Sequence, residues 1–185
     1  MTEARLTNAE GGEPVVRLER QLADPPSVVW RALTEREQLS RWFPCEIAVE
    51  GEAWVVGAAL LFRFPAEVID LTLRGEVLAV EAPRLLSFSW GEDILRFELF
   101  REGSGTRLVL SDQLPPATAA RNAAGWQTCL HRLAGLEPDA DAWRDAFSRY
   151  AELFAPALGP QQGPPAGHLL DTARAGNRAE RGSRQ

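Results

Sequence analysis

The stretch LTEREQLSRWFP, residues 33–44, places a short polar helical turn directly before the aromatic pair Trp42 and Phe43 and a proline. Thr34, with Glu37 three residues later, forms a capping-box pattern, which predicts the start of a short helix. The proline predicts where that helix ends. Large apolar side chains at the end of a surface helix need a partner that covers them. The stretch therefore predicts a helical turn that packs on a second layer of structure.

Upstream of this stretch, residues 15–22 read VVRLERQL and alternate between apolar and polar side chains. This alternation predicts a strand with one buried face. Arg20 interrupts the apolar face, and we interpret it as a polar group that faces a cavity. Residues 24–33, DPPSVVWRAL, then predict a helix, with Asp24 as its N-cap before a proline suited to the first helical position.

Downstream, short apolar runs separated by glycine and proline predict an antiparallel sheet of six or seven strands, counting the strand at residues 15–22. The clearest alternation is LRFELF, residues 95–100, in which leucine and phenylalanine oppose arginine and glutamate. A Gly-Ser-Gly turn at residues 103–105 follows it and predicts a hairpin. The expected strands of this region span residues 46–50, 58–64, 71–81, 85–90, 95–101 and 106–114.

Beyond residue 116 the apolar period changes to that of a helix. A long helix is expected over residues 119–134, where small side chains and Trp126 share one face and would let it lie close to a curved sheet. A second helix restarts near residue 140 and continues through residue 154. The expected organisation is a flexible leader, one domain and a disordered tail rich in Pro, Gly and Arg, over residues 1–13, 14–156 and 157–185.

Composition excludes several classes of function. The net charge of −6 and pI near 5.1 disfavour a nucleic-acid partner, which requires a basic face. All 20 basic residues other than histidine are arginine, so no lysine is present for Schiff-base chemistry. The sequence contains no apolar run long enough for a membrane span and begins with a polar, acidic segment. We therefore expect a cytoplasmic protein, and the Arg-, Ala- and Gly-rich composition is typical of a GC-rich bacterial genome.

Motifs of catalysis and cofactor binding are absent from the sequence. There is no GxGxxG, P-loop or HExxH pattern, and the two cysteines, Cys45 and Cys129, form no CxxC pair. His131 and His168 have no nucleophile or carboxylate at a recognisable spacing. We expect no catalytic residue, no metal site and no cofactor, with both cysteines buried and reduced.

Several blocks in a fixed order resemble one family. They are the LT…L..RWF pattern at residues 33–43, RGEVLAVEAPRLLSFSW at 74–90, FELFREGSGTRLVLS at 97–111 and GWQTCLHRLAG at 125–135. They are similar to the activator of heat-shock-protein-90 ATPase homologue family (C-terminal-domain-like). This family belongs to the START, polyketide cyclase and birch-pollen-allergen-like (SRPBCC) superfamily. The chain departs from the family at Asp112, where many members carry a histidine.

The resemblance implies an α+β helix-grip fold: a curved antiparallel sheet wrapped around a long C-terminal helix, with two short helices after the first strand. It also implies a cavity between sheet and helix, and relatives that bind apolar small molecules. We therefore expect the protein to bind a small hydrophobic ligand, such as a lipid, a polyketide or another apolar metabolite, without catalysis. The expected lining residues are Trp42, Phe43, Trp54, Phe62, Phe64, Phe88, Trp90, Phe97, Trp126 and Leu130.

Three alternatives stay open at this point. The same aromatic side chains could simply fill the interior as core. The protein could be a cyclase- or hydrolase-like enzyme that uses Arg20, Glu76 or Asp112 as a polar group in the cavity. It could also be a protein-binding module that acts on a chaperone, which predicts an exposed apolar or charged patch on the sheet. For the ligand-binding domain we expect a monomer or a homodimer.

Overall fold

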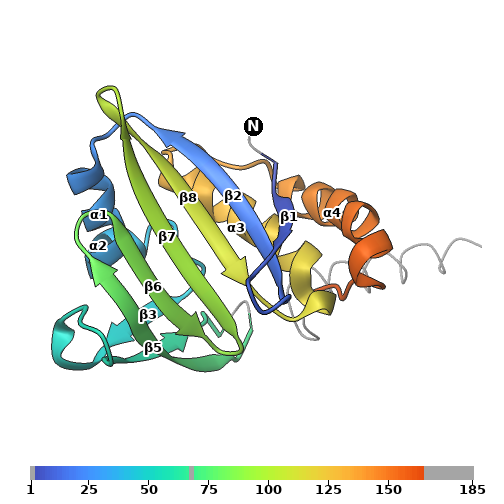
Figure 1. Ribbon diagram of the computed structural model, residues 1–185, viewed down its shortest axis with the longest axis horizontal. Helices are drawn as coiled ribbons and strands as arrows, with labels where there is room; N and C mark the ends of the chain where they lie inside the picture. The colour runs from blue at the N-terminus through green and yellow to red at the C-terminus, as the bar shows by residue number, and fades with distance from the viewer. Residues whose placement is uncertain (1–2, 67–68, 165–185) are drawn as a thin grey trace, which may run out of the picture.

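The computed structural model of the protein describes residues 3–66 and 69–164 (Figure 1). Its helices are α1 (Pro26–Thr34), α2 (Arg36–Leu39), α3 (Ala119–Leu133) and α4 (Ala142–Leu158), with short 3-10 turns η1 (Glu50–Glu52) and η2 (Pro116–Thr118). Its strands are β1 (Arg5–Asn8), β2 (Pro14–Leu22), β3 (Glu46–Val49), β4 (Ala59–Arg63), β5 (Thr72–Glu81), β6 (Leu85–Trp90), β7 (Asp93–Glu102) and β8 (Gly105–Gln113).

The strands form one eight-stranded sheet in the order β1-β2-β8-β7-β6-β5-β4-β3. Every neighbouring pair is antiparallel, and β3 to β8 follow one another as a meander. β2 leaves this order and pairs with the last strand, which aligns Leu18 with Leu110. The first long strand, the two short helices, the antiparallel sheet and the long helix follow one another as expected for a helix-grip fold. That fold is therefore confirmed.

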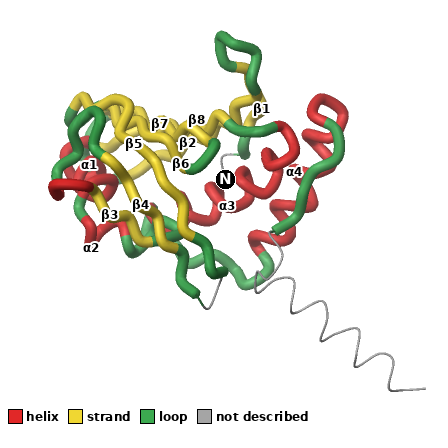
Figure 2. Tube along the Cα trace, turned by 90° about the horizontal axis from the view of Figure 1, so that it is seen from below, coloured by secondary structure: helices red, strands yellow, loops and turns green. Residues whose placement is uncertain are grey.

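The alternation seen in the sequence sets the two faces of the sheet. On β7, Leu95, Phe97 and Leu99 are buried, whereas Arg96 is exposed on the other face. Figure 2 shows that the helices lie on one side of the sheet, with α1 and α2 at one end and α4 at the opposite end beyond α3. The core lies between that side of the sheet and α3, whose alanines and Trp126 are buried. Small side chains on α3 permit its close approach to the sheet.

Two predicted helix caps are wrong. Thr34 is the last residue of α1, and its hydroxyl donates to the carbonyl of Trp30 at 2.8 Å instead of capping α2. Glu35 is the N-cap of α2, and Pro25, not Asp24, is the N-cap of α1; neither makes a side-chain capping bond. In each case the cap lies one residue later than the pattern indicates. For Thr34 the reason is that the Trp30 carbonyl competes for its hydroxyl.

The expected flexible leader is also corrected. Residues Arg5–Asn8 form strand β1, which pairs with the start of β2 in register Leu6 to Val16. The backbone N–H of Ala4 donates to the Tyr150 hydroxyl of α4 at 2.9 Å, which holds this segment to the last helix. The expected tail begins inside α4, which continues to Leu158, and its residues from 165 onward lie outside the described residues.

Candidate functional site

The opening stretch, residues 33–44, supplies a hydrophobic anchor between the short helices and the sheet. Trp42 is 2% exposed, and its indole Nε1 donates to the Ala32 carbonyl of α1 at 2.9 Å. The Trp42 ring meets Phe97 of the sheet edge-on, with ring centroids 6.1 Å apart. Phe43 meets Trp126 of α3 at 5.5 Å. The aromatic pair therefore joins α2, the sheet and α3.

The other aromatic residues predicted for the site extend this cluster. Phe62, Phe88 and Phe97 stack in series across the sheet, with neighbouring centroids 5.9 Å apart. Trp90 and Trp126 meet at 5.2 Å. Leu130 on α3 is buried in the same core, and Trp54, Phe64 and Trp90 are partly buried against it. The structure thus brings all the predicted lining residues together, and their contact with a ligand stays a prediction.

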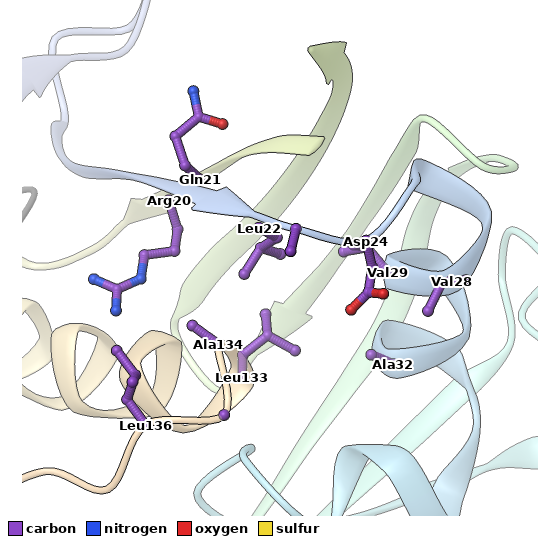
Figure 3. Close-up of a pocket in the computed structure, with 12 residues that line it drawn as sticks. Arg20, Gln21, Leu22, Asp24, Val28, Val29, Ala32, Leu133, Ala134 and Leu136 are labelled. Atoms are coloured by element: carbon purple, nitrogen blue, oxygen red, sulfur yellow. The ribbon is translucent and has the colours of Figure 1, made fainter. Parts of the chain in front are cut away.

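A pocket of about 580 Å³ opens beside this core, between the end of β2, α1 and the end of α3 (Figure 3). Its volume is in the range typical of small-molecule sites. None of the predicted aromatic residues lines it. Its walls are largely aliphatic, and the residues are Arg20, Gln21, Leu22, Ala23, Asp24, Val28, Val29, Ala32, Leu133, Ala134, Gly135 and Leu136.

The mouth of the pocket carries aliphatic side chains that water contacts. Val28 on α1 is 39% exposed and Leu136 after α3 is 48% exposed. Val29, deeper in the pocket wall, is buried and belongs to the hydrophobic core. The pocket therefore exposes aliphatic side chains to water beside polar ones, and the aliphatic part of its wall favours an apolar body in the occupant.

Arg20 is the cation of this pocket. It stands on β2 opposite Leu108 of β8, on the face that carries the buried Val16 and Leu18, and is itself half-buried. Figure 3 shows its guanidinium directed toward the end of α3. Among residues 3–66 and 69–164, no carboxylate forms an ion pair with it. The prediction that Arg20 faces a cavity is confirmed.

Two further titratable groups affect the charge around the pocket. His131 of α3 has its pKa lowered from its ordinary value, first by burial and then by the positive charge of Arg20. Its imidazole is therefore neutral at pH 7 and leaves the charge of Arg20 in place. Asp24 lies on the α1 side of the pocket, away from the guanidinium (Figure 3).

A buried carboxyl cluster lies near the start of α3. Asp112 of β8 has no solvent exposure, and its Oδ2 accepts hydrogen bonds from Trp126 Nε1 at 2.7 Å and from Asn122 Nδ2 at 3.0 Å. The same amide nitrogen of Asn122 donates to Asp93 Oδ2 of β7 at 2.8 Å. Asp112 Oδ1 has no hydrogen-bond partner within the described part of the chain.

Burial controls the ionisation of this cluster. It raises the pKa of Asp112 well above its usual range, and the negative charge of Asp93 raises it further. Burial likewise raises the pKa of Asp93 to about 6, although Asn122 and Arg121 oppose the increase. Burial therefore favours the protonated form of Asp112 over its charged form. Among the polar groups considered for catalysis, Asp112 faces the interior and Glu76 is exposed.

The cysteines are buried and free, as the sequence predicted. Burial raises the pKa of both Cys45 and Cys129 to about 12, so neither forms the thiolate that nucleophilic or redox chemistry requires. Of the two histidines in the sequence, His168 lies outside the described residues. Within those residues, no three His, Cys, Asp or Glu side chains gather to hold a metal ion, and no helix is long and apolar enough to cross a membrane.

The family model described as "Activator of Hsp90 ATPase homolog 1-like protein" matches residues 23–136. The chain belongs to this family. The matched region of this Hsp90-activator-homologue-like protein contains the α1 and α3 walls of the pocket, whereas Arg20, Gln21 and Leu22 of β2 lie before it. No curated protein sequence matches the chain.

Solved structures share the fold of this Hsp90-activator-homologue-like protein. CalU16 from Micromonospora echinospora is 22% identical, with a TM-score of 0.65 over 83% of this chain and 98% of its own. The conserved protein of unknown function EF2215 from Enterococcus faecalis is 23% identical, with a TM-score of 0.67 over 83% of this chain and 91% of its own. DynU16, a protein of the dynemicin biosynthetic locus, is 25% identical, with a TM-score of 0.56 over 65% of this chain and 46% of its own.

Sequence reasoning missed most of the pocket lining. The aliphatic walls, such as Val28, Ala32 and Leu133, carry no motif, and their meeting depends on where α1 and α3 end. Arg20 was detectable because it breaks an apolar alternation. Asp93 and Asn122 had no local signal, because they become neighbours only through strand pairing and the packing of α3.

Proposed function

We propose that the protein binds a small apolar molecule, without covalent chemistry, in the pocket between β2, α1 and the end of α3. The observation that supports this proposal is the aliphatic pocket of about 580 Å³, whose mouth exposes Val28 and Leu136 to water. Exposed aliphatic side chains at the mouth of a concave site are typical of a binding surface. The raised thiol pKa values leave the chain without a cysteine nucleophile.

The comparisons support the same proposal at a coarser level. The resemblance to the SRPBCC superfamily implies relatives that bind apolar small molecules, and DynU16, a structural neighbour, comes from the dynemicin biosynthetic locus. A lipid, a polyketide or another apolar metabolite fits such a pocket.

The test is native mass spectrometry on protein purified from its own host, followed by organic extraction. We expect a bound mass that denaturation releases. Ala32→Trp, which fills the pocket with an indole, should abolish the bound mass. Phe100→Trp on the exposed outer face of β7 is the matched control and should retain it. An equal bound mass in the Ala32→Trp variant would place the ligand elsewhere, and apo protein throughout would argue against the proposal.

A second candidate is acid-base catalysis by Asp112, favoured by its burial and its unpartnered Oδ1. A protonated carboxyl group in the interior can donate a proton to a bound substrate. This candidate predicts that host metabolites incubated with the wild type are chemically converted, whereas Asp112→Asn protein leaves them unchanged. Recovery of the extracted molecule unaltered from the wild type would count against it.

A further inference from the structure

We propose that the pocket selects apolar molecules that carry an anionic group, and that Arg20 binds this group; this inference rests on the proposed function. Arg20 is the feature of the pocket that an entirely apolar ligand leaves unexplained. It occupies an inward-facing position of β2, in register with buried Val16 and Leu18, where an aliphatic side chain would continue the core.

The charge of Arg20 is not balanced within the described structure. The other inward-facing neighbours are Leu108 across the strand pair and Leu22 at the strand end, and neither accepts a hydrogen bond through its side chain. A half-buried guanidinium loses part of its hydration, and that loss is compensated only when an anion or other acceptor meets it. By contrast, Arg17 and Arg107 on the outer face of the sheet both pair with Glu19.

The surrounding charges define where the anion would bind. On the α3 side, His131 is uncharged at neutral pH, because burial and Arg20 itself lower its pKa. Asp139 acts on His131 as a nearby negative charge, but it does not line the pocket or form an ion pair with Arg20. On the α1 side, Asp24 would repel an anion. The positive end of the pocket is therefore the end next to α3 (Figure 3).

This arrangement gives the ligand an orientation. Its anionic group would meet the guanidinium beside the end of α3, and its apolar body would contact Val28, Val29 and Ala32 of α1 and Leu133. The planar fork of arginine matches a carboxylate with two parallel hydrogen bonds, so a carboxylic acid with an aliphatic or polyketide-like body is the ligand class that fits best.

The test compares three probes of equal chain length and different charge: decanoate, 1-decanol and decyltrimethylammonium. Binding to full-length protein is measured by calorimetry, and methyl NMR shifts of Leu133 and Val28 locate each probe. We expect decanoate to bind about tenfold or more tightly than decanol, and the cation to bind most weakly, because a charge-assisted pair is gained only by the anion.

The variant Arg20→Met keeps an unbranched side chain, removes the guanidinium and restores the apolar alternation. It should bind decanoate and decanol equally, with the affinity for decanol retained as evidence of an intact pocket. Arg96→Met, on the exposed face of β7, removes the same charge and should keep the preference for decanoate. Equal binding of decanoate and decanol by the wild type, or an unchanged preference in Arg20→Met, would overturn the role of Arg20 and leave the proposed function standing. No shift of the pocket methyl groups with any probe would overturn both.

Discussion

Trp126 Nε1 of α3 donates a 2.7 Å hydrogen bond to Asp112 Oδ2 of β8, and both side chains are buried. This bond joins the long helix to the last strand through a carboxyl group that water does not reach. Because burial disfavours the charged form, the folded-state pKa of Asp112 is raised well above its usual range. The stability of the fold is therefore linked to pH through this contact.

Replacing Asp112 with Asn should stabilise the protein at alkaline pH. Because its folded-state pKa is raised, Asp112 makes its full contribution to stability only below the pKa of the unfolded state, about 3.9. This contribution is lost as the pH rises toward the folded-state pKa. Asparagine keeps an oxygen for Trp126 and Asn122 and has no proton to lose. We expect a gain in the free energy of unfolding at pH 8 and little change at pH 4, measured by urea denaturation.

The control for this prediction is Asp112→Ala, which removes the acceptor and leaves the buried Trp126 N–H unpaired. It should cost about 1–3 kcal/mol at acidic pH, where the wild-type carboxyl group is neutral. A loss of stability in Asp112→Asn at both pH values, equal to that of the alanine variant, would contradict the raised pKa of Asp112.

Asp93 should titrate near pH 6 in the folded protein. Burial raises its pKa to about 6, so its contribution to stability is lost as pH rises from about 4 through 6, in the same direction as that of Asp112. Carbon-13 NMR of the side-chain carboxyl group measures this midpoint directly. In the Asp112→Asn variant the midpoint should stay nearly unchanged, because burial of Asp93, and not a charge on Asp112, raises its pKa. A midpoint near 4 in the wild type would refute the prediction.

Among single substitutions in residues 33–44, Trp42→Ala should be the most destabilising. The side chain is 2% exposed and contacts Phe43 and Phe97. Truncating a buried tryptophan costs about 3–5 kcal/mol. Chemical denaturation measures this loss, and Val55→Ala, at a side chain that is 56% exposed, should change stability by less than about 0.5 kcal/mol. Similar effects of the two changes would mean that Trp42 is not a core anchor.

Tyr150→Phe should loosen strand β1 from the last helix. The tyrosine hydroxyl accepts the Ala4 N–H and donates to Gln127, so its removal leaves the Ala4 N–H without this partner. We expect faster hydrogen exchange at residues 4–8 and a cost of about 0.5–1.5 kcal/mol. Exchange in β7 should be unaffected and serves as the internal reference. Unchanged protection at residues 4–8 would show that pairing with β2 alone holds this strand.

The periodic elements were predictable because their signals are local. Residues 85–90 were expected as a strand and form β6, and the long helix was expected over 119–134 and spans Ala119–Leu133. Apolar alternation reports which side of a strand is buried, so the inward position of Arg20 was also predictable. The helix caps and β1 were not, since each depends on competing hydrogen bonds or on a partner strand elsewhere in the chain.

The sequence by itself determined the family, the order of strands and helices, and the inward cation at Arg20. Only the tertiary structure decided where the pocket lies and which carboxyl groups are buried together. The pocket forms where β2, α1 and the end of α3 meet, and the carboxyl cluster forms where β7, β8 and α3 meet. Burial and electrostatic environment arise from residues far apart in the chain, and no local pattern encodes them.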